Sequence, residues 1–95
     1  MNVIKETVPV KELMAGLAEE CCELAQAALK LRRVWDGTNP TPMTEDTAID
    51  RLYEEIADVR LYLKQIDVNV ASVEEIMAQK EARWKSRLAE GKVDK

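Results

Sequence analysis

The sequence predicts an all-α fold of three helices in a single domain that covers residues 1–95. The chain contains two Trp, two Tyr and no Phe, and its apolar residues are mostly Leu, Ile, Val, Met and Ala, which favours helices over sheets. Three stretches repeat apolar residues at helical spacing, and no stretch is predicted to be a strand. A domain of this size buries only about two thirds of its unfolded surface, so a partner chain could contribute to the core.

The first helix is predicted to cover residues 9–33, about 37 Å of helix. Pro9 is tolerated in the first turn of a helix, and Lys30, Arg32 and Arg33 suit the negative end of the helix dipole. The apolar stripe of this helix consists of Val10, Leu13, Met14, Leu17, Cys21, Leu24, Ala28 and Leu31. The adjacent cysteines of this helix, at positions 21 and 22, point about 100° apart and are expected to be reduced thiols.

Residues 35–42 interrupt the helical pattern with Gly, Asn and two Pro residues, and they are predicted to form a loop that extends past Met43. The second helix is predicted to begin near Thr44 or Thr47 and to end near Ile66. Its apolar stripe consists of Ile49, Leu52, Ile56, Val59, Leu63 and Ile66.

The third helix is predicted to begin at Ser72 and to end before Gly91. Ser72 and Glu75 have the spacing of a capping box, in which each side chain accepts a hydrogen bond from the backbone of the other. The apolar stripe of this helix consists of Val73, Met77, Trp84 and Leu88.

Two pairs of acidic residues border the first two apolar stripes. Glu20 and Glu23 in the first helix, like Glu55 and Asp58 in the second, are three residues apart and so project from one helix face about 5 to 6 Å from each other. Both pairs lie on the same rotational side of their stripes. A connection through one loop favours antiparallel packing, which would carry both pairs to the same side of the two helices.

Four gathered carboxylates require a cation, because two like charges about 5 Å apart repel by roughly 3 kcal/mol at an effective dielectric of about 20. Mg²⁺ prefers oxygen ligands, so Mg²⁺ is the expected cofactor, with Mn²⁺ as a substitute. The alternative is that these acidic residues only face solvent. The chain has no His, so water activation falls to a metal or a carboxylate. Glu19 or Glu23 could accept the proton, and we favour Glu19 because the others would be occupied as ligands.

Basic residues on the third helix supply the opposite charge. Lys80 lies within the apolar stripe, and Arg83 and Arg87 border it. Lys80 could extend its ammonium group past the stripe into water, or these residues could bind the phosphates of a ligand whose metal is held by the acidic cluster. Trp35, in the predicted loop, could stack on a base or anchor the end of the helices.

Charge and hydropathy exclude several kinds of partner. The net charge is −4, the pI is about 4.9 and the chain has no basic tract, so duplex nucleic acid is not an expected partner. The N-terminus lacks the apolar segment of a signal peptide, and no run approaches the roughly 18 apolar residues of a membrane span. We therefore expect no membrane partner and a cytoplasmic location.

Residues 17–27 and 52–59 contain the sequences LAEECCELAQA and LYEEIADV. These resemble the EExxE and ExxD signature of the MazG-like all-α nucleoside triphosphate pyrophosphohydrolases, and the resemblance extends over about Leu13 to Leu63. It implies hydrolysis of a nucleotide substrate to a monophosphate and pyrophosphate. It further implies a homodimer or homotetramer in which long helices from two chains form a four-helix bundle. The interval between the two motifs is longer than is usual in the family.

In this family the acidic motifs hold Mg²⁺, so the resemblance assigns the metal to Glu20, Glu23, Glu55 and Asp58. Two alternatives remain open. Phosphoribosyl-ATP pyrophosphohydrolases have a similar motif and fold, so the substrate could be that nucleotide. The chain could instead be a non-catalytic helical module that dimerises or binds a partner helix through its apolar stripes.

Overall fold

The computed structural model describes residues 3–40 and 42–91, which form helices and no strands. The helices are α1 (Val3–Thr7), α2 (Val10–Asp36), α3 (Glu45–Gln65) and α4 (Val70–Ala89). The predicted all-α class is confirmed, and the three predicted helices correspond to α2, α3 and α4. The short helix α1 is an addition that the sequence analysis did not predict.

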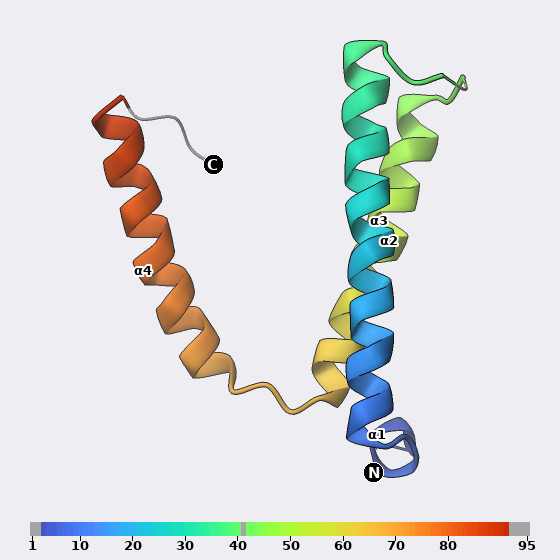
Figure 1. The fold of residues 1–95 in the computed structure, drawn as a ribbon, viewed down its shortest axis with the longest axis vertical. Coiled ribbons are helices and arrows are strands. Elements are labelled where there is room, and N and C mark those ends of the chain that lie inside the picture. The colour runs from blue at the N-terminus through green and yellow to red at the C-terminus, as the bar shows by residue number, and fades with distance from the viewer. Residues whose placement is uncertain (1–2, 41, 92–95) are drawn as a thin grey trace.

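α2 and α3 run antiparallel and pack side by side as a hairpin (Figure 1). Their contact buries a small set of apolar side chains, namely Leu13, Ala27, Leu31 and Ala48. Gly16 is also buried in α2, and the ring of Tyr62 from α3 occupies the space beside it. The hairpin is therefore the packed part of the chain, and it carries both acidic motifs.

α2 ends at Asp36, three residues beyond the predicted end, and so contains Trp35, which had been assigned to the loop. Nothing in the sequence interrupts the helix before Gly37, whose φ of 76° is the left-handed conformation that glycine adopts readily. The backbone N–H and the hydroxyl of Thr38 both donate to the Asp36 carboxylate, at 3.0 and 2.6 Å. These bonds fix the first turn of the connection to α3.

The start of α3 agrees with the prediction, because Thr44 is its N-cap and accepts a hydrogen bond from the backbone N–H of Thr47. The start of α4 was predicted wrongly. Asn69 is the N-cap, and its side chain accepts the backbone N–H of Ser72 at 3.0 Å. Ser72 thus lies three residues inside the cap, because Asn69 is an equally good capping residue that comes earlier in the chain.

α4 projects away from the hairpin instead of packing along it (Figure 1). The radius of gyration is 17.1 Å, against about 12 Å for a compact chain of this length. Every described residue of α4 is exposed, including Met77 at 61%, Trp84 at 50% and Leu88 at 56%. The apolar stripe of α4 is therefore uncovered in the single chain. Over the described residues, no helix combines the length and the apolar character needed to cross a membrane.

Replacement of Gly16 by Ala tests the contact between α2 and α3. An added Cβ would lie 2.3 Å from the Tyr62 ring, so Gly16→Ala forces the ring to move, and overpacking of this kind costs about 1–3 kcal/mol. Ala is favoured over Gly inside a helix by about 1 kcal/mol, which offsets part of that cost. In a Tyr62→Leu background the clash is absent, so the same change should stabilise the fold. Urea denaturation of the four chains measures this coupling, and additive effects would show that the close contact is not important.

Candidate metal centre

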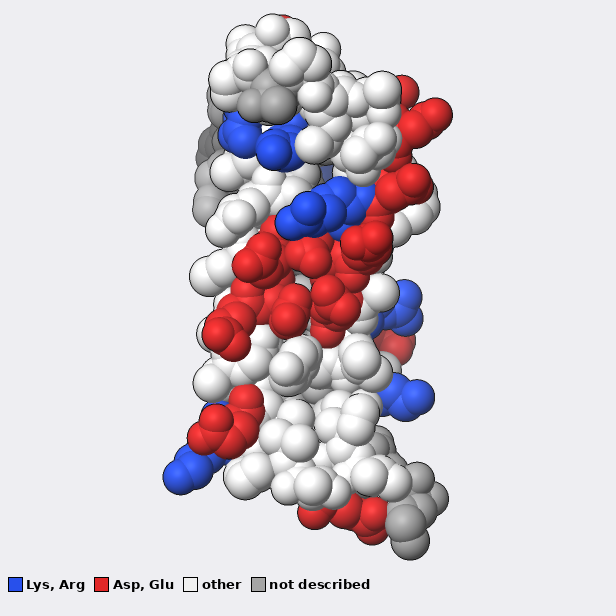
Figure 2. Space-filling view, turned by 90° about the vertical axis from the view of Figure 1, so that its right-hand side faces the viewer, with Lys and Arg blue, Asp and Glu red and all other residues white. Residues whose placement is uncertain are grey.

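Three carboxylates from the two acidic motifs converge on one side of the hairpin. Glu20 of α2 and Glu55 and Asp58 of α3 each offer an oxygen atom, and these three atoms lie within 4.8 Å of one another. Glu55 is only 7% exposed, and Glu20 is half-buried. The antiparallel packing thus brings the two motifs together, as their matching position beside the apolar stripes predicts. In Figure 2 acidic side chains gather on this face of the hairpin.

The protonation of two of these groups reflects their crowding. Burial raises the pKa of Glu55, and the nearby charge of Asp58 raises it further, while Arg51, one turn earlier in α3, opposes the rise. Burial also raises the pKa of Glu20, as do the charges of Asp58 and Glu23. A protonated Glu20 can donate a hydrogen bond to Asp58, which further favours the neutral form. Both carboxyl groups therefore hold their protons more tightly than free ones.

The donor set fits a hard divalent cation. All three groups are carboxylates, which are the ligands that Mg²⁺ prefers, and it usually keeps several waters while binding only a few protein groups. A cation would also relieve the repulsion that raises the two pKa values. The group contains no thiol or imidazole, so it has none of the ligands that favour zinc.

The remaining acidic candidates lie at the edge of this group. Glu23 is exposed and outside the three-residue cluster, but its charge raises the pKa of both Glu20 and Glu55, so it lies close to them. Glu19 is exposed as well, and its charge acts on Glu20. Both side chains border the cluster from α2, on its solvent side.

The predicted phosphate-binding residues are not brought to the cluster within one chain. Lys80, Arg83 and Arg87 lie on α4, which projects away from the hairpin (Figure 1). Trp35 lies near the end of α2, and its indole N–H donates to the carboxylate of Glu45 at the start of α3. This bond ties the two helices together at the loop end of the hairpin, which matches the anchoring role proposed for Trp35.

A second group of cations, which was not predicted from the sequence, lies beside the acidic cluster. Lys30 and Arg33 of α2 and Arg51 of α3 line a cavity of about 270 Å³. In Figure 2, Lys and Arg side chains adjoin the acidic ones on the side toward the α2–α3 loop. Lys30 and Arg33 had been explained by the helix dipole alone, and Arg51 had not been singled out. The available signal was the position of Arg51, one helical turn before Glu55.

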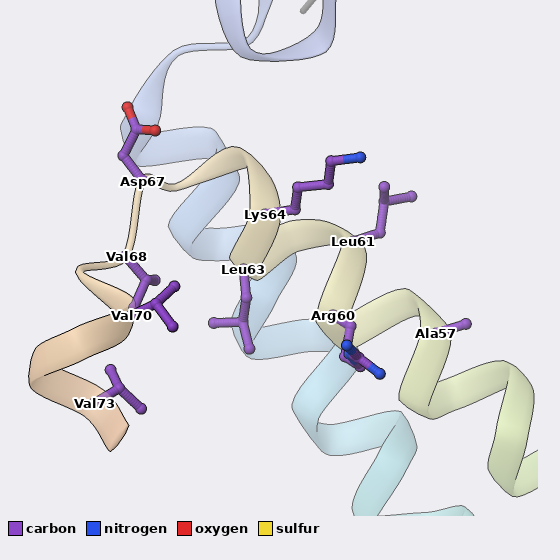
Figure 3. Close-up of a pocket in the computed structure, with 9 residues that line it drawn as sticks. All are labelled: Ala57, Arg60, Leu61, Leu63, Lys64, Asp67, Val68, Val70 and Val73. Atoms are coloured by element: carbon purple, nitrogen blue, oxygen red, sulfur yellow. The ribbon is translucent and has the colours of Figure 1, made fainter. Parts of the chain in front are cut away.

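A second cavity, of about 700 Å³, lies at the junction of α3 and α4 (Figure 3). Val70 and Val73 of α4 point toward Leu63 of α3 across it, and Arg60 and Lys64 also line it. None of the clustered carboxylates lines this cavity. Val73 belongs both to the lining of this cavity and to the uncovered stripe of α4.

Comparison of the chain with protein-family models, with curated proteins and with solved structures found no match.

The raised pKa values predict how Glu55→Gln changes the pH dependence of stability. A carboxyl group whose pKa is higher in the folded state stabilises the fold below its unfolded pKa of 4.5, and this contribution is lost as the pH rises through the folded value. The amide that replaces the carboxyl group cannot ionise. The stability of the variant relative to the unchanged protein should therefore increase from pH 4 to pH 7, as measured by urea denaturation without divalent ions.

Glu54→Gln is the matched control for this experiment, because Glu54 is the exposed neighbour of Glu55 in α3. The control should follow the unchanged protein at each pH. If the free energy of unfolding has the same pH dependence in the Glu55 variant and the unchanged protein, the pKa of Glu55 is not raised by folding.

Proposed function

We propose that this protein is a Mg²⁺-dependent nucleotide pyrophosphohydrolase that converts a nucleoside triphosphate to its monophosphate and pyrophosphate. The observation that carries the proposal is the convergence of Glu20, Glu55 and Asp58, whose oxygen atoms lie within 4.8 Å of one another. They come from the two sequence blocks that resemble the MazG-like signature. An arrangement of carboxylates that disfavours its own ionisation is suited to binding a cation.

Each carboxylate has a role in this proposal. Glu20, Glu55 and Asp58 bind the metal, and Glu23 completes the set from the exposed edge of α2. Glu55 is buried, which limits the movement of its side chain. Mg²⁺, or Mn²⁺ in its place, would polarise the attacking water and neutralise the phosphates. Glu19 lies beside the ligands without belonging to the close group, which leaves it free to accept a proton.

The reaction is a substitution at the α-phosphorus. The oxygen of a water molecule forms a bond to this phosphorus, and the bond to the oxygen that bridges the α- and β-phosphates breaks. The electron pair of the broken bond leaves with pyrophosphate, and the proton of the water passes to Glu19. Because the chain contains no His, a metal or a carboxylate activates the water, and Glu19 is the carboxylate to which we assign the proton.

We further propose that the active form is a homodimer or a homotetramer. In the described residues, only four apolar side chains are buried, while α4 exposes its entire apolar stripe. A second chain packed on this stripe would supply the burial that the single chain lacks. Such packing would also allow Lys80, Arg83 and Arg87 of the partner subunit to approach the phosphates.

The second candidate function is a non-catalytic module that dimerises or binds a partner helix. The uncovered stripe of α4 and the cavity at its base favour it, because both offer exposed apolar side chains to a partner. This function needs no metal, so Mg²⁺ dependence separates it from the enzyme. Phosphoribosyl-ATP is an alternative substrate for the same metal centre.

Pyrophosphate release from a panel of nucleotides, with and without Mg²⁺, tests the enzymatic function. The panel includes dUTP, dCTP and phosphoribosyl-ATP, and at least one member should be hydrolysed only when Mg²⁺ is present. Glu55→Gln and Asp58→Asn should each lower the rate by about 100-fold or more, because several kcal/mol of transition-state stabilisation depend on the metal. Glu54→Gln should retain full activity.

Mg²⁺ should also raise the melting temperature of the unchanged protein and of Glu54→Gln, but not that of Glu55→Gln. The enzymatic proposal is wrong if no nucleotide is hydrolysed and Mg²⁺ leaves all three melting temperatures unchanged. The non-catalytic module would then be the better explanation.

Sedimentation of two charge variants tests self-association. Met77 lies in the apolar stripe of α4, so Met77→Glu should place a charge in the proposed interface and shift the protein toward monomer. Ala82→Glu adds the same charge on the opposite side of the helix and should leave the assembly intact. Equal behaviour of the two variants would show that the stripe is not the interface.

A further inference from the structure

A cavity lined by three cations lies beside the carboxylate cluster. Lys30 and Arg33 come from the last two turns of α2, and Arg51 comes from the second turn of α3. No acidic side chain lines the cavity, and none of these three cations forms an ion pair with a residue that the structure describes. Lys30 and Arg33 are also half-buried. Arg33 and Arg51 act on the charges of Asp36 and Glu55 only from a distance, so an anion in the cavity would give these cations a direct partner.

The helix dipole explains only part of this arrangement. The carbonyl end of α2 attracts Lys30 and Arg33, but it attracts the neighbouring Arg32 equally, and Arg32 does not line the cavity. Arg51 lies near the positive end of α3, where the dipole gives no reason for a cation. The cavity therefore has cations from two helices, and the dipole of α3 does not explain the presence of Arg51.

Arg51 connects the cavity to the carboxylates. It lines the cavity, and Glu55 lies one turn, or about 6 Å, further along α3. The acidic and basic groups thus follow each other along one side of the hairpin (Figure 2). A ligand that binds a metal at one end and presents free negative charge at the other would span both.

We propose that the basic cavity holds the pyrophosphate part of the substrate, which leaves when the bond at the α-phosphate is broken beside the carboxylates. The volume of about 270 Å³ is below the roughly 300–1,000 Å³ of pockets that hold drug-sized ligands, so it suits this part better than a whole nucleotide. The inference rests on the proposed function, because it assigns a position to one half of that substrate.

This position fixes the direction of the substrate along the hairpin. The phosphates extend toward the α2–α3 loop, and the nucleoside lies on the other side of the carboxylates, toward the end where α3 joins α4. Trp35, at the loop end, then joins the helices through Glu45 and does not stack on the base. In this position the phosphates contact Lys30, Arg33 and Arg51, which belong to the same chain as the proposed metal ligands.

Calorimetric titration of the full chain with inorganic pyrophosphate, in the presence of Mg²⁺, tests the inference without requiring turnover. Lys30→Gln and Arg33→Gln should each weaken pyrophosphate binding about 10-fold, and the double variant should weaken it more, because each change removes a charge-assisted hydrogen bond. Arg32→Gln is the matched control, since it removes the same charge from the same helix end, and its affinity should be unchanged. Arg51 is left intact because it also acts on Glu55.

The outcomes separate this inference from the proposed function. If the unchanged protein hydrolyses a nucleotide but the double variant binds pyrophosphate as well as the control does, the assigned position is wrong and the enzymatic function stands. If no nucleotide is hydrolysed while pyrophosphate binding still requires Lys30 and Arg33, the cavity is an anion site and the enzymatic function fails. Absence of pyrophosphate binding to the unchanged protein would also overturn the inference.

Discussion

The structure depends on the antiparallel contact between α2 and α3, which buries Glu55 beside other carboxylates. Gly16 makes this contact close, because a side chain at this position would meet the Tyr62 ring. The same packing leaves Glu55 almost without solvent and places it near the charges of Asp58, Glu20 and Glu23. The pKa of Glu55 is therefore raised above that of a free carboxyl group, chiefly by burial. Arg51 supplies positive charge that opposes this rise, and a divalent cation would supply more.

The contact between α2 and α3 also places acidic and basic side chains next to each other along the hairpin. The carboxylates and the basic cavity share one side of it, yet Lys30, Arg33 and Arg51 form no ion pairs with them in the described part of the chain. Direct pairing would neutralise both groups and leave neither able to bind a ligand. In the proposed function, their separation along the helices would leave the acidic group available to a metal and the basic group available to an anion. A metal-bound polyphosphate has both of the charges that this surface would complement.

α4 takes no part in this arrangement within a single chain. The hairpin buries few apolar side chains, and the apolar stripe of α4 remains open to solvent. A chain that gains so little burial by itself is unlike a stable monomer of the same length, whose helices would pack together. The low burial is explained if a second copy covers the α4 stripe, and the basic residues of α4 would then act across the interface.

The sequence by itself determined the helical class, the approximate limits of the long helices and the four acidic residues beside their apolar stripes. These follow from local causes, namely the spacing of apolar residues, Gly37 at the end of α2 and Thr44 at the start of α3. The start of α4 was predicted wrongly because two residues there can cap a helix, and Asn69 caps it ahead of Ser72. Only the tertiary structure decided that Glu55 is buried while Glu23 stays exposed, and that α4 stands apart from the hairpin. It also decided that Arg51 joins Lys30 and Arg33 around one cavity. This grouping depends on how α2 and α3 are aligned against each other, and the residue pattern within one helix does not determine that alignment.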